Sequence, residues 1–208
     1  MKKQIVLVGG GGHCKVIIDA IKLKNKFSIY GITDFKLAKK TKILGVPVLG
    51  KDDMLLEIFK KGIKYAFISV GSVGDCSIRK RIDKELVKIG FKLPAIIHPR
   101  AIAAKDAEIG EGTFVAAGVV INPGTRIGRN AIINTSASID HDCEIGDFAH
   151  IAPGVTLSGG VKIGSETHIG VGANIIQYVK IGSGCMVKAG ALLTDNLGDR
   201  QIWPKNRP

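Results

Sequence analysis

The chain has 208 residues, of which 45% are hydrophobic and 27 are glycine, and this apolar content excludes an intrinsically disordered chain. No apolar run approaches the roughly 20 residues of a membrane-spanning helix. The formal net charge of +12 is unevenly distributed: residues 1–100 hold 21 Lys and Arg against 8 Asp and Glu, whereas residues 101–208 hold 9 against 10. The lysines are scattered and lack an aromatic stacking platform. We therefore expect a solvated basic surface or a phosphate-bearing ligand, and neither nucleic-acid nor membrane binding.

The chain begins with the pattern of a strand, a loop, a helix and a second strand. Gln4–Val8 predicts a first strand, residues 13–24 a helix, and Ser28–Ile32 a second strand. The glycines at 9–12 stand directly before the helix, where backbone N–H groups can hold a phosphate. Their match to G-x-G-x-x-G has Cys14 in place of the last glycine, so the motif alone is weak evidence for nucleotide binding.

Asp34 follows the second predicted strand. A dinucleotide-binding fold places its ribose-binding acid here, but a simple turn residue is an equal alternative. Further along, residues 53–61 and 77–89 predict helices and residues 65–70 a strand. The predicted domain, residues 1–96, is shorter than a full dinucleotide fold. A mononucleotide or a nucleotide sugar therefore fits it better than NAD.

A six-residue repeat dominates the second half of the chain. An aliphatic residue occurs every six positions, fifteen times without a miss, and a small residue lies two positions before each one. The aliphatic positions are Ile109, Val115, Ile121, Ile127, Ile133, Ile139, Ile145, Ile151, Leu157, Ile163, Ile169, Ile175, Ile181, Val187 and Leu193. Glycine follows six of the aliphatics, and we expect it to adopt turn dihedrals that other residues avoid.

A six-residue period does not fit an α-helix, but it fits short strands joined by turns, as in a parallel β-helix. The repeat resembles the left-handed β-helix of bacterial acyltransferases, with three hexapeptides in each 18-residue coil. Residues 18 apart then lie on one face, at about the 4.8 Å spacing of neighbouring strands. We expect this domain to span residues 97–195, followed by a tail at 196–208.

Three sequence blocks, in order, resemble one family. They are residues 9–16 (GGGGHCKV), residues 97–99 (IHP), and the stretch from Asn134 to Gly154, which contains Asp140-His141-Asp142 and His150. The chain is similar to bacterial sugar acetyltransferases of the sialic acid O-acetyltransferase and UDP-4-amino-sugar N-acetyltransferase type. It departs from them at its end, where residues 203–208 replace a Gly-x-Pro-Ala-type loop.

The resemblance implies an acetyl-CoA-dependent enzyme that acetylates a nucleotide-linked amino sugar in bacterial glycan biosynthesis. It implies a homotrimer with active sites between subunits, and no metal. His141 would be the general base, Asp142 its acidic partner, and His150 would lie near the acetyl group. The residues expected near the nucleotide sugar are Gly11, His13, Asp34, Gly71 and Ser72.

The chemistry of acetyl transfer fits these side chains. The acceptor needs a base near neutral pH, and an imidazole oriented by a carboxylate supplies one. Either Asp142 or Asp140 can be that carboxylate. Gly159 lies 18 residues after His141, so the repeat predicts a position without a side chain one coil along. We expect it to leave room for the thioester of acetyl-CoA and a backbone N–H for the oxyanion.

The cysteines argue against a covalent acyl-enzyme. Cys143 and Cys185 occupy inward-facing repeat positions, and Cys14 and Cys76 lie in the other domain. We therefore expect direct attack on the thioester. The absence of CxxC spacing predicts a reducing, cytoplasmic location.

Three alternatives remain open. An Asp-supported histidine also suits O-acetylation of sialic acid or a related sugar. His150 and His168 are 18 residues apart and predicted to stack, which suits a zinc site of the β-helical carbonic anhydrase type shared between subunits. A non-catalytic trimer that binds a nucleotide sugar would show binding without turnover.

Overall fold

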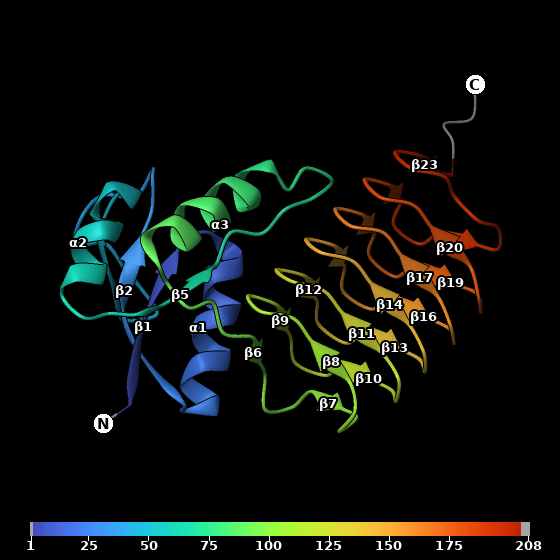
Figure 1. The fold of residues 1–208 in the computed structure, drawn as a ribbon, viewed down its shortest axis with the longest axis horizontal. Helices are drawn as coiled ribbons and strands as arrows, with labels where there is room; N and C mark the ends of the chain where they lie inside the picture. Colours follow the sequence, from blue (N-terminus) through green and yellow to red (C-terminus); the bar gives the residue numbers. More distant parts are fainter. Residues whose placement is uncertain (1, 205–208) are drawn as a thin grey trace. The chain divides into compact units, whose positions relative to one another are not determined.

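The computed structural model describes residues 2–204, which form two compact units. The first unit extends to Pro99 but omits Val73–Cys76, and the second comprises Val73–Cys76 and the chain from Arg100 onward. Figure 1 shows the ribbon with many of its helices and strands labelled. None of the helices in the described residues is long and apolar enough to cross a membrane.

The first unit contains a five-stranded sheet in the order β3-β4-β2-β1-β5. The strands are β1 (Lys3–Val8), β2 (Phe27–Thr33), β3 (Lys42–Ile43), β4 (Val46–Gly50) and β5 (Tyr65–Ile68). All neighbours are parallel except β3 and β4. β3 and β4 were not predicted from the sequence, because β3 has only two residues and β4 contains a proline that disfavours a strand prediction.

Helices cover this sheet. They are α1 (Gly12–Lys24), a 3₁₀ turn η1 (Asp52–Met54) that leads into α2 (Leu55–Lys60), and α3 (Ser77–Ile89). Residues of α2 and α3 form a buried cluster with Val6 and Val8 of β1, and this cluster includes Leu55, Ile58, Ile82 and Leu86. The last four residues of β1 are buried, as expected for a parallel strand with both faces covered. A short strand, β6 (Ile96–Ile97), precedes the end of the unit.

The second unit is a parallel β-helix whose two-residue strands build three sheets (Figure 1). The first sheet contains β7 (Ile102–Ala103), β10 (Val120–Ile121), β13 (Ser138–Ile139), β16 (Thr156–Leu157), β19 (Asn174–Ile175) and β22 (Leu192–Leu193). The second contains β8 (Glu108–Ile109), β11 (Arg126–Ile127), β14 (Glu144–Ile145), β17 (Lys162–Ile163) and β20 (Lys180–Ile181). The third contains β9 (Phe114–Val115), β12 (Ile132–Ile133), β15 (His150–Ile151), β18 (His168–Ile169), β21 (Met186–Val187) and β23 (Ile202–Trp203).

The strand register confirms that residues 18 apart stack, as in the pairs of Ile121 with Ile139 and of His150 with His168. All but one of the fifteen repeat aliphatics are buried, and they form the core of the coil. The exception is Ile109, near the start of the β-helix, which is only partly buried.

The glycines that follow the aliphatics have a different role from the one predicted. A Cβ on Gly110 would lie 2.5 Å from the backbone of Gly128 in the next coil, so these glycines permit close approach of two backbones. The positive φ angles occur instead at other turn positions, such as Gly118 at 72°.

Residues 196–203, expected as a tail, continue the β-helix. Ile202 pairs with Met186, and Leu197 bridges to Ile181. The remaining tail residues, 205–208, lie outside the described residues.

Candidate functional site

His141 lies in the turn that joins β13 to β14, between two aspartates with different contacts. The Nδ1 atom of His141 is 2.8 Å from Oδ2 of Asp142. Oδ1 of Asp140 instead accepts the backbone N–H of His141 at 2.8 Å and the side-chain amide of Asn122 at 3.0 Å. In this geometry Asp142 contacts the imidazole, while Asp140 shapes the turn that presents it.

The contact with Asp142 also sets the protonation of the imidazole. A carboxylate can only accept a hydrogen bond, so the neutral ring carries its proton on Nδ1 and leaves Nε2 with a lone pair. The hydrogen bond to Asp142 raises the pKa of His141, partial desolvation opposes that rise, and the charge of Asp140 supports it. The His141 side chain is 52% exposed, so Nε2 is accessible to a reacting group.

Gly159 lies one coil beyond His141, as the repeat predicts. The N–H of Gly160 donates to the His141 carbonyl at 2.8 Å, and a Cβ on Gly159 would lie 2.5 Å from Nε2 of His141. The imidazole itself therefore occupies the space beside Gly159 that we expected to remain open. Within the described residues, the Gly159 N–H donates to no acceptor.

His150 and His168 stack on the third sheet of the β-helix. Their ring centroids are 4.8 Å apart with an interplanar angle of 76°, close to the predicted strand spacing. Nε2 of His150 lies 3.2 Å from Nδ2 of Asn134, and burial lowers the pKa of His168. Between residues 2 and 204, no cluster of three or more His, Cys, Asp or Glu side chains is arranged to hold a metal ion.

Asp34 ties the glycine loop to the end of β2. Its Oδ2 accepts the N–H of Gly10 at 2.6 Å, and its Oδ1 accepts the N–H groups of Lys36 and Leu37 at 2.8 and 2.9 Å. Burial alone would raise the pKa of Asp34, but the three backbone hydrogen bonds and Lys36 give a net lowering. Asp34 thus has the role of a turn residue, one of the two roles that its sequence position allows, and it also lines a cavity.

Three other predicted residues lie close together. A Cβ on Gly71 would be 3.4 Å from the Cβ of His13, and Ser72 Oγ accepts a hydrogen bond from the buried Arg79 at 3.0 Å. Burial, assisted by the charge of Arg79, lowers the pKa of His13 to about 4, so this imidazole is neutral at pH 7. Around Gly11, at the start of α1, the space that a side chain would fill is open.

A cavity of about 240 Å³ opens at the carboxyl ends of the parallel strands in the first unit. It is lined by Val8, Gly9, Asp34, Phe35, Lys36, Asp52, Val70, Ile78, Arg81 and Ile82. Of the predicted site residues only Asp34 lines it. Arg81 and Lys36 were not predicted as site residues, although the position of Lys36 shortly after the end of β2 is a signal that could have identified it.

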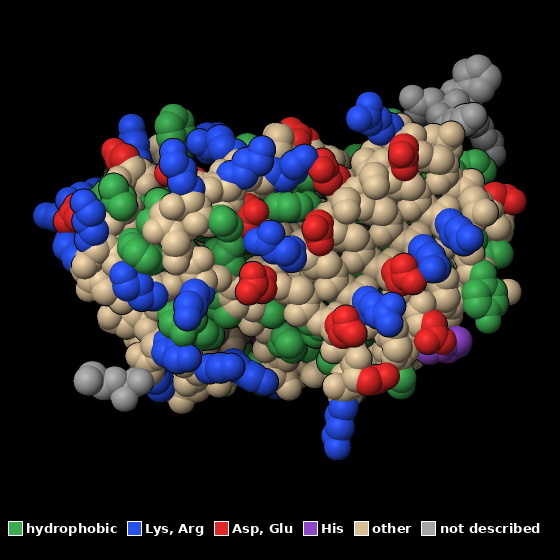
Figure 2. Space-filling model, viewed as in Figure 1, with side chains coloured by type: hydrophobic (Ala, Val, Ile, Leu, Met, Phe, Trp, Pro, Cys, Tyr) green, Lys and Arg blue, Asp and Glu red, His purple; other side chains and the backbone are tan. Residues whose placement is uncertain are grey.

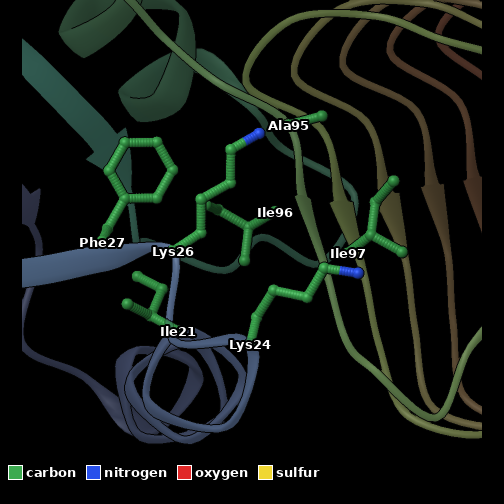
Figure 3. Close-up of a pocket in the computed structure, with 7 residues that line it drawn as sticks. All are labelled: Ile21, Lys24, Lys26, Phe27, Ala95, Ile96 and Ile97. Carbon is green, nitrogen blue, oxygen red and sulfur yellow. The ribbon is translucent and has the colours of Figure 1, made fainter. Parts of the chain in front are cut away.

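A second cavity, of about 270 Å³, lies in the same unit near the end of α1 (Figure 3). Apolar side chains line it, including Ile21, Phe27 and Ile96, together with Lys24 and Lys26. It contains none of the predicted site residues, and we assign it no role.

The surface charges match the distribution in the sequence. In Figure 2, Lys and Arg side chains predominate over the α/β unit, whereas both signs of charge are mixed over the β-helix. The carboxylate of Glu144 and the ammonium group of Lys162, for example, are 2.8 Å apart on the second sheet of the β-helix.

Comparison with known proteins identifies both halves of the chain. Residues 4–86 match the family model of the PglD N-terminal domain, and residues 124–159 match the bacterial transferase hexapeptide model of six repeats. The chain is also 35% identical over 116 residues to UDP-N-acetylbacillosamine N-acetyltransferase of Bacillus subtilis (strain 168). That match spans 55% of this chain and about half, 52%, of the relative.

Two solved structures are similar over nearly the whole chain. One is a histidine-to-asparagine mutant of perosamine N-acetyltransferase from Caulobacter crescentus in complex with CoA and GDP-perosamine. It has 36% identity and a TM-score of 0.89, covering 96% of this chain and 92% of that one. The other is the acetyltransferase domain of PglB from Neisseria gonorrhoeae FA1090 in complex with acetyl coenzyme A. It has 33% identity and a TM-score of 0.86, covering 97% and 96%.

The fold and the repeat define a hexapeptide-repeat acyltransferase with an α/β N-terminal domain. The predicted fold class, an α/β domain followed by a left-handed parallel β-helix, is thereby confirmed. The chain belongs to the bacterial sugar acetyltransferase family that includes the nucleotide-sugar N-acetyltransferases.

Proposed function

We propose that this protein transfers the acetyl group of acetyl-CoA to the amino group of a nucleotide-linked 4-amino sugar. The observation that carries the proposal is the His141–Asp142 pair, in which Nδ1 contacts the carboxylate at 2.8 Å and Nε2 is left to accept a proton. Two of the similar proteins are N-acetyltransferases, and one of these was solved with CoA and GDP-perosamine, which favours nitrogen over oxygen as the acceptor.

His141 is the general base in this proposal. As the amine nitrogen of the sugar attacks the thioester carbonyl, its proton moves to Nε2 of His141. The new C–N bond forms, the C–S bond breaks, and the CoA thiolate leaves and takes up the proton held on Nε2, which returns His141 to its neutral form. Asp142 holds the Nδ1–H and stabilises the imidazolium that forms during the step.

The negative charge on the carbonyl oxygen needs a hydrogen-bond donor during attack. The Gly159 N–H supports this role, because it donates to no acceptor in the described residues and belongs to the glycine whose Cβ position lies beside Nε2 of His141. Removing one such donor in an acyl-transfer enzyme costs on the order of 10²-fold or more in rate. We also propose that His150 lies near the acetyl group. Nε2 of His150 is 3.2 Å from Nδ2 of Asn134, a contact that fixes the orientation of the ring.

The α/β unit would hold the nucleotide portion of the sugar substrate. Gly11 and the start of α1 offer N–H groups to a phosphate. Lys36 and Arg81 bring positive charge to the cavity at the strand ends, where nucleotides bind in open parallel sheets. His13, Gly71 and Ser72 lie together and complete the proposed nucleotide-sugar site.

We also propose that the protein is a homotrimer with its active sites between subunits. The match of residues 124–159 to the bacterial transferase hexapeptide model supports this. Size-exclusion chromatography with light scattering would give three times the 22.1 kDa chain mass if this is right. We place the enzyme in the cytoplasm, because its donor, acetyl-CoA, is a cytoplasmic metabolite.

The acceptor class is tested by product analysis. The protein is incubated with acetyl-CoA and, separately, with UDP-4-amino sugars, GDP-perosamine and sialic acid, and the products are examined by mass spectrometry. The proposal predicts a mass increase of one acetyl group on a nucleotide amino sugar, stable to neutral hydroxylamine because it is an amide. A hydroxylamine-sensitive product on sialic acid would instead identify an O-acetyltransferase. Binding of a nucleotide sugar without any acetylated product would favour the non-catalytic alternative.

A further inference from the structure

The turn that joins β13 to β14 rests on the turn one coil earlier, which joins β10 to β11 and contains residues 122–125. The backbone N–H of Asp142 donates to the Pro123 carbonyl at 3.0 Å. The hydroxyl of Thr125, a buried side chain, donates to the carbonyl of Asp140 at 3.0 Å. The earlier turn therefore fixes the backbone on both sides of the proposed base.

Gly124, in the earlier turn, lies against the carboxylate of Asp142. A Cβ on Gly124 would overlap with Oδ1 of Asp142 and lie 3.4 Å from its Cγ. The other carboxylate oxygen, Oδ2, is the atom that lies 2.8 Å from Nδ1 of His141. The carboxylate thus fits between the backbone of Gly124 and the imidazole, in space that a side chain at position 124 would occupy.

The backbone of Gly124 is itself held in place, because its N–H donates to Oδ2 of Asp106 at 2.9 Å. Its φ of 73° is the regular turn geometry of the repeat, as the φ of 66° at Gly172 shows. The two glycines differ in their surroundings, since a Cβ on Gly172 would meet no atom within 4 Å. A side chain at position 124 would therefore displace the carboxylate of Asp142, whereas one at position 172 would displace nothing.

We propose that Gly124 is a positioning residue, whose lack of a side chain lets the Asp142 carboxylate reach Nδ1 of His141. This inference rests on the proposed function, in which Nε2 of the same ring accepts the proton of the amine. Without the carboxylate, the neutral imidazole can carry its proton on either nitrogen, and only one of the two tautomers leaves Nε2 free to act as a base.

The first experiment compares Gly124→Ala with the matched control Gly172→Ala. Alanine is disfavoured at both positive φ angles, so both substitutions should lower the thermal midpoint by a similar amount. Only Gly124→Ala should lower kcat, by about 10- to 100-fold, with the KM values of both substrates within about twofold of wild type. Gly172→Ala should keep the kcat of wild type.

A second substitution at the same position keeps the test valid if Gly124→Ala does not fold. Asparagine adopts a positive φ more readily than alanine, as Asn130 does at 51° in this chain. Gly124→Asn introduces the same Cβ with less backbone strain, and it should show the same loss of kcat.

A double substitution separates an effect on Asp142 from a general distortion of the turn. In Asp142→Ala the carboxylate that a methyl group at position 124 would displace is already absent. The double variant Gly124→Ala/Asp142→Ala should therefore have a kcat within about twofold of Asp142→Ala alone. If Gly124→Ala lowers kcat in Asp142→Ala by the same factor as in wild type, the two residues act independently and the inference is wrong.

The protonation of His141 gives a measurement that needs no turnover. The hydrogen bond to Asp142 raises the pKa of His141, so Gly124→Ala should lower the midpoint of its NMR titration, and Gly172→Ala should leave it unchanged. His141→Gln identifies the signal of this ring among those of the five histidines. An unchanged midpoint in Gly124→Ala would overturn the inference.

The kinetic results can also contradict it. Wild-type kcat in Gly124→Ala, or an equal loss of kcat in Gly172→Ala, would show that the space beside Gly124 does not position the carboxylate. A wild-type protein that acetylates no sugar would contradict the proposed function instead. The NMR titration would still decide the role of Gly124 in that case.

Discussion

Gly159 and His141 are 18 residues apart in sequence but adjacent in space. A Cβ at position 159 would lie 2.5 Å from Nε2 and 2.6 Å from Cε1 of the imidazole. Real Cβ atoms do not approach other atoms so closely, so any side chain at this position must move the His141 ring. The repeat period that builds the fold therefore also determines the space available to the proposed base.

Substitution of Gly159 should impair the chemical step. Gly159→Ala forces the imidazole away from its position, and we expect kcat to fall by about 10- to 100-fold. The larger Gly159→Leu should also weaken acetyl-CoA binding. Gly198→Ala is the control, because its nearest neighbour atom would be at an ordinary 3.5 Å. Wild-type kcat in Gly159→Ala would refute the assigned geometry.

The pH dependence should follow the protonation of His141. The base must be neutral to accept a proton, so kcat/KM falls as pH drops below the raised pKa of His141. Asp142→Asn removes the carboxylate that raises this pKa, and the acid limb should move to lower pH while the maximal rate declines. Rate profiles of both proteins between pH 5 and 9 check this. An acid limb that stays in place in Asp142→Asn would show that another group titrates.

Asp34 should support both stability and nucleotide binding. Its carboxylate accepts three backbone N–H groups, so Asp34→Ala should lower the free energy of unfolding by about 2 kcal/mol. Asp34→Asn retains one acceptor oxygen, so its free energy of unfolding should fall by less than that of Asp34→Ala. Urea unfolding measures the stability, and titration with a nucleotide sugar measures the binding. Equal stability of Asp34→Ala and wild type would contradict the anchoring role.

Substitution of His168 should show how its buried Nδ1 atom affects the stability of the protein. Its side chain is buried, and Nδ1 has no hydrogen-bond partner within the described residues. His168→Phe keeps a ring against His150 and removes the unsatisfied nitrogen, so it should leave stability equal or raised. His168→Ala should lose about 2 to 4 kcal/mol, because it leaves a cavity. Thermal or urea unfolding compares the two. If His168→Phe is as destabilised as His168→Ala, the nitrogen has a partner after all.

Much of the β-helix could be predicted, because a single six-residue repeat determines which residues face inward and which residues stack. The inward aliphatics, the stacking of His150 on His168, and the proximity of Gly159 to His141 all follow from residues 18 apart. The sequence could not show which aspartate contacts the His141 ring, because Asp140 and Asp142 are both adjacent to His141 in sequence. Their different contacts depend on the turn dihedrals, with Asp142 at a φ of 59°.

The α/β unit was predicted less completely. Its helices and central strands show clear sequence patterns, but β4 contains Pro47, and the edge strand β3 has only two residues. The cavity at the strand ends brings Arg81 on α3 together with Asp34 after β2. No sequence spacing connects these positions, since they meet only through the order of the sheet.

The role of His141 is tested by the rate of free-thiol release from acetyl-CoA with a nucleotide-linked 4-amino sugar, compared between wild type and His141→Ala. We expect sugar-dependent release by wild type and a decrease of about 10²-fold or more in the variant, with sugar binding nearly unchanged. Equal rates in the two proteins would contradict the role of His141 as the base.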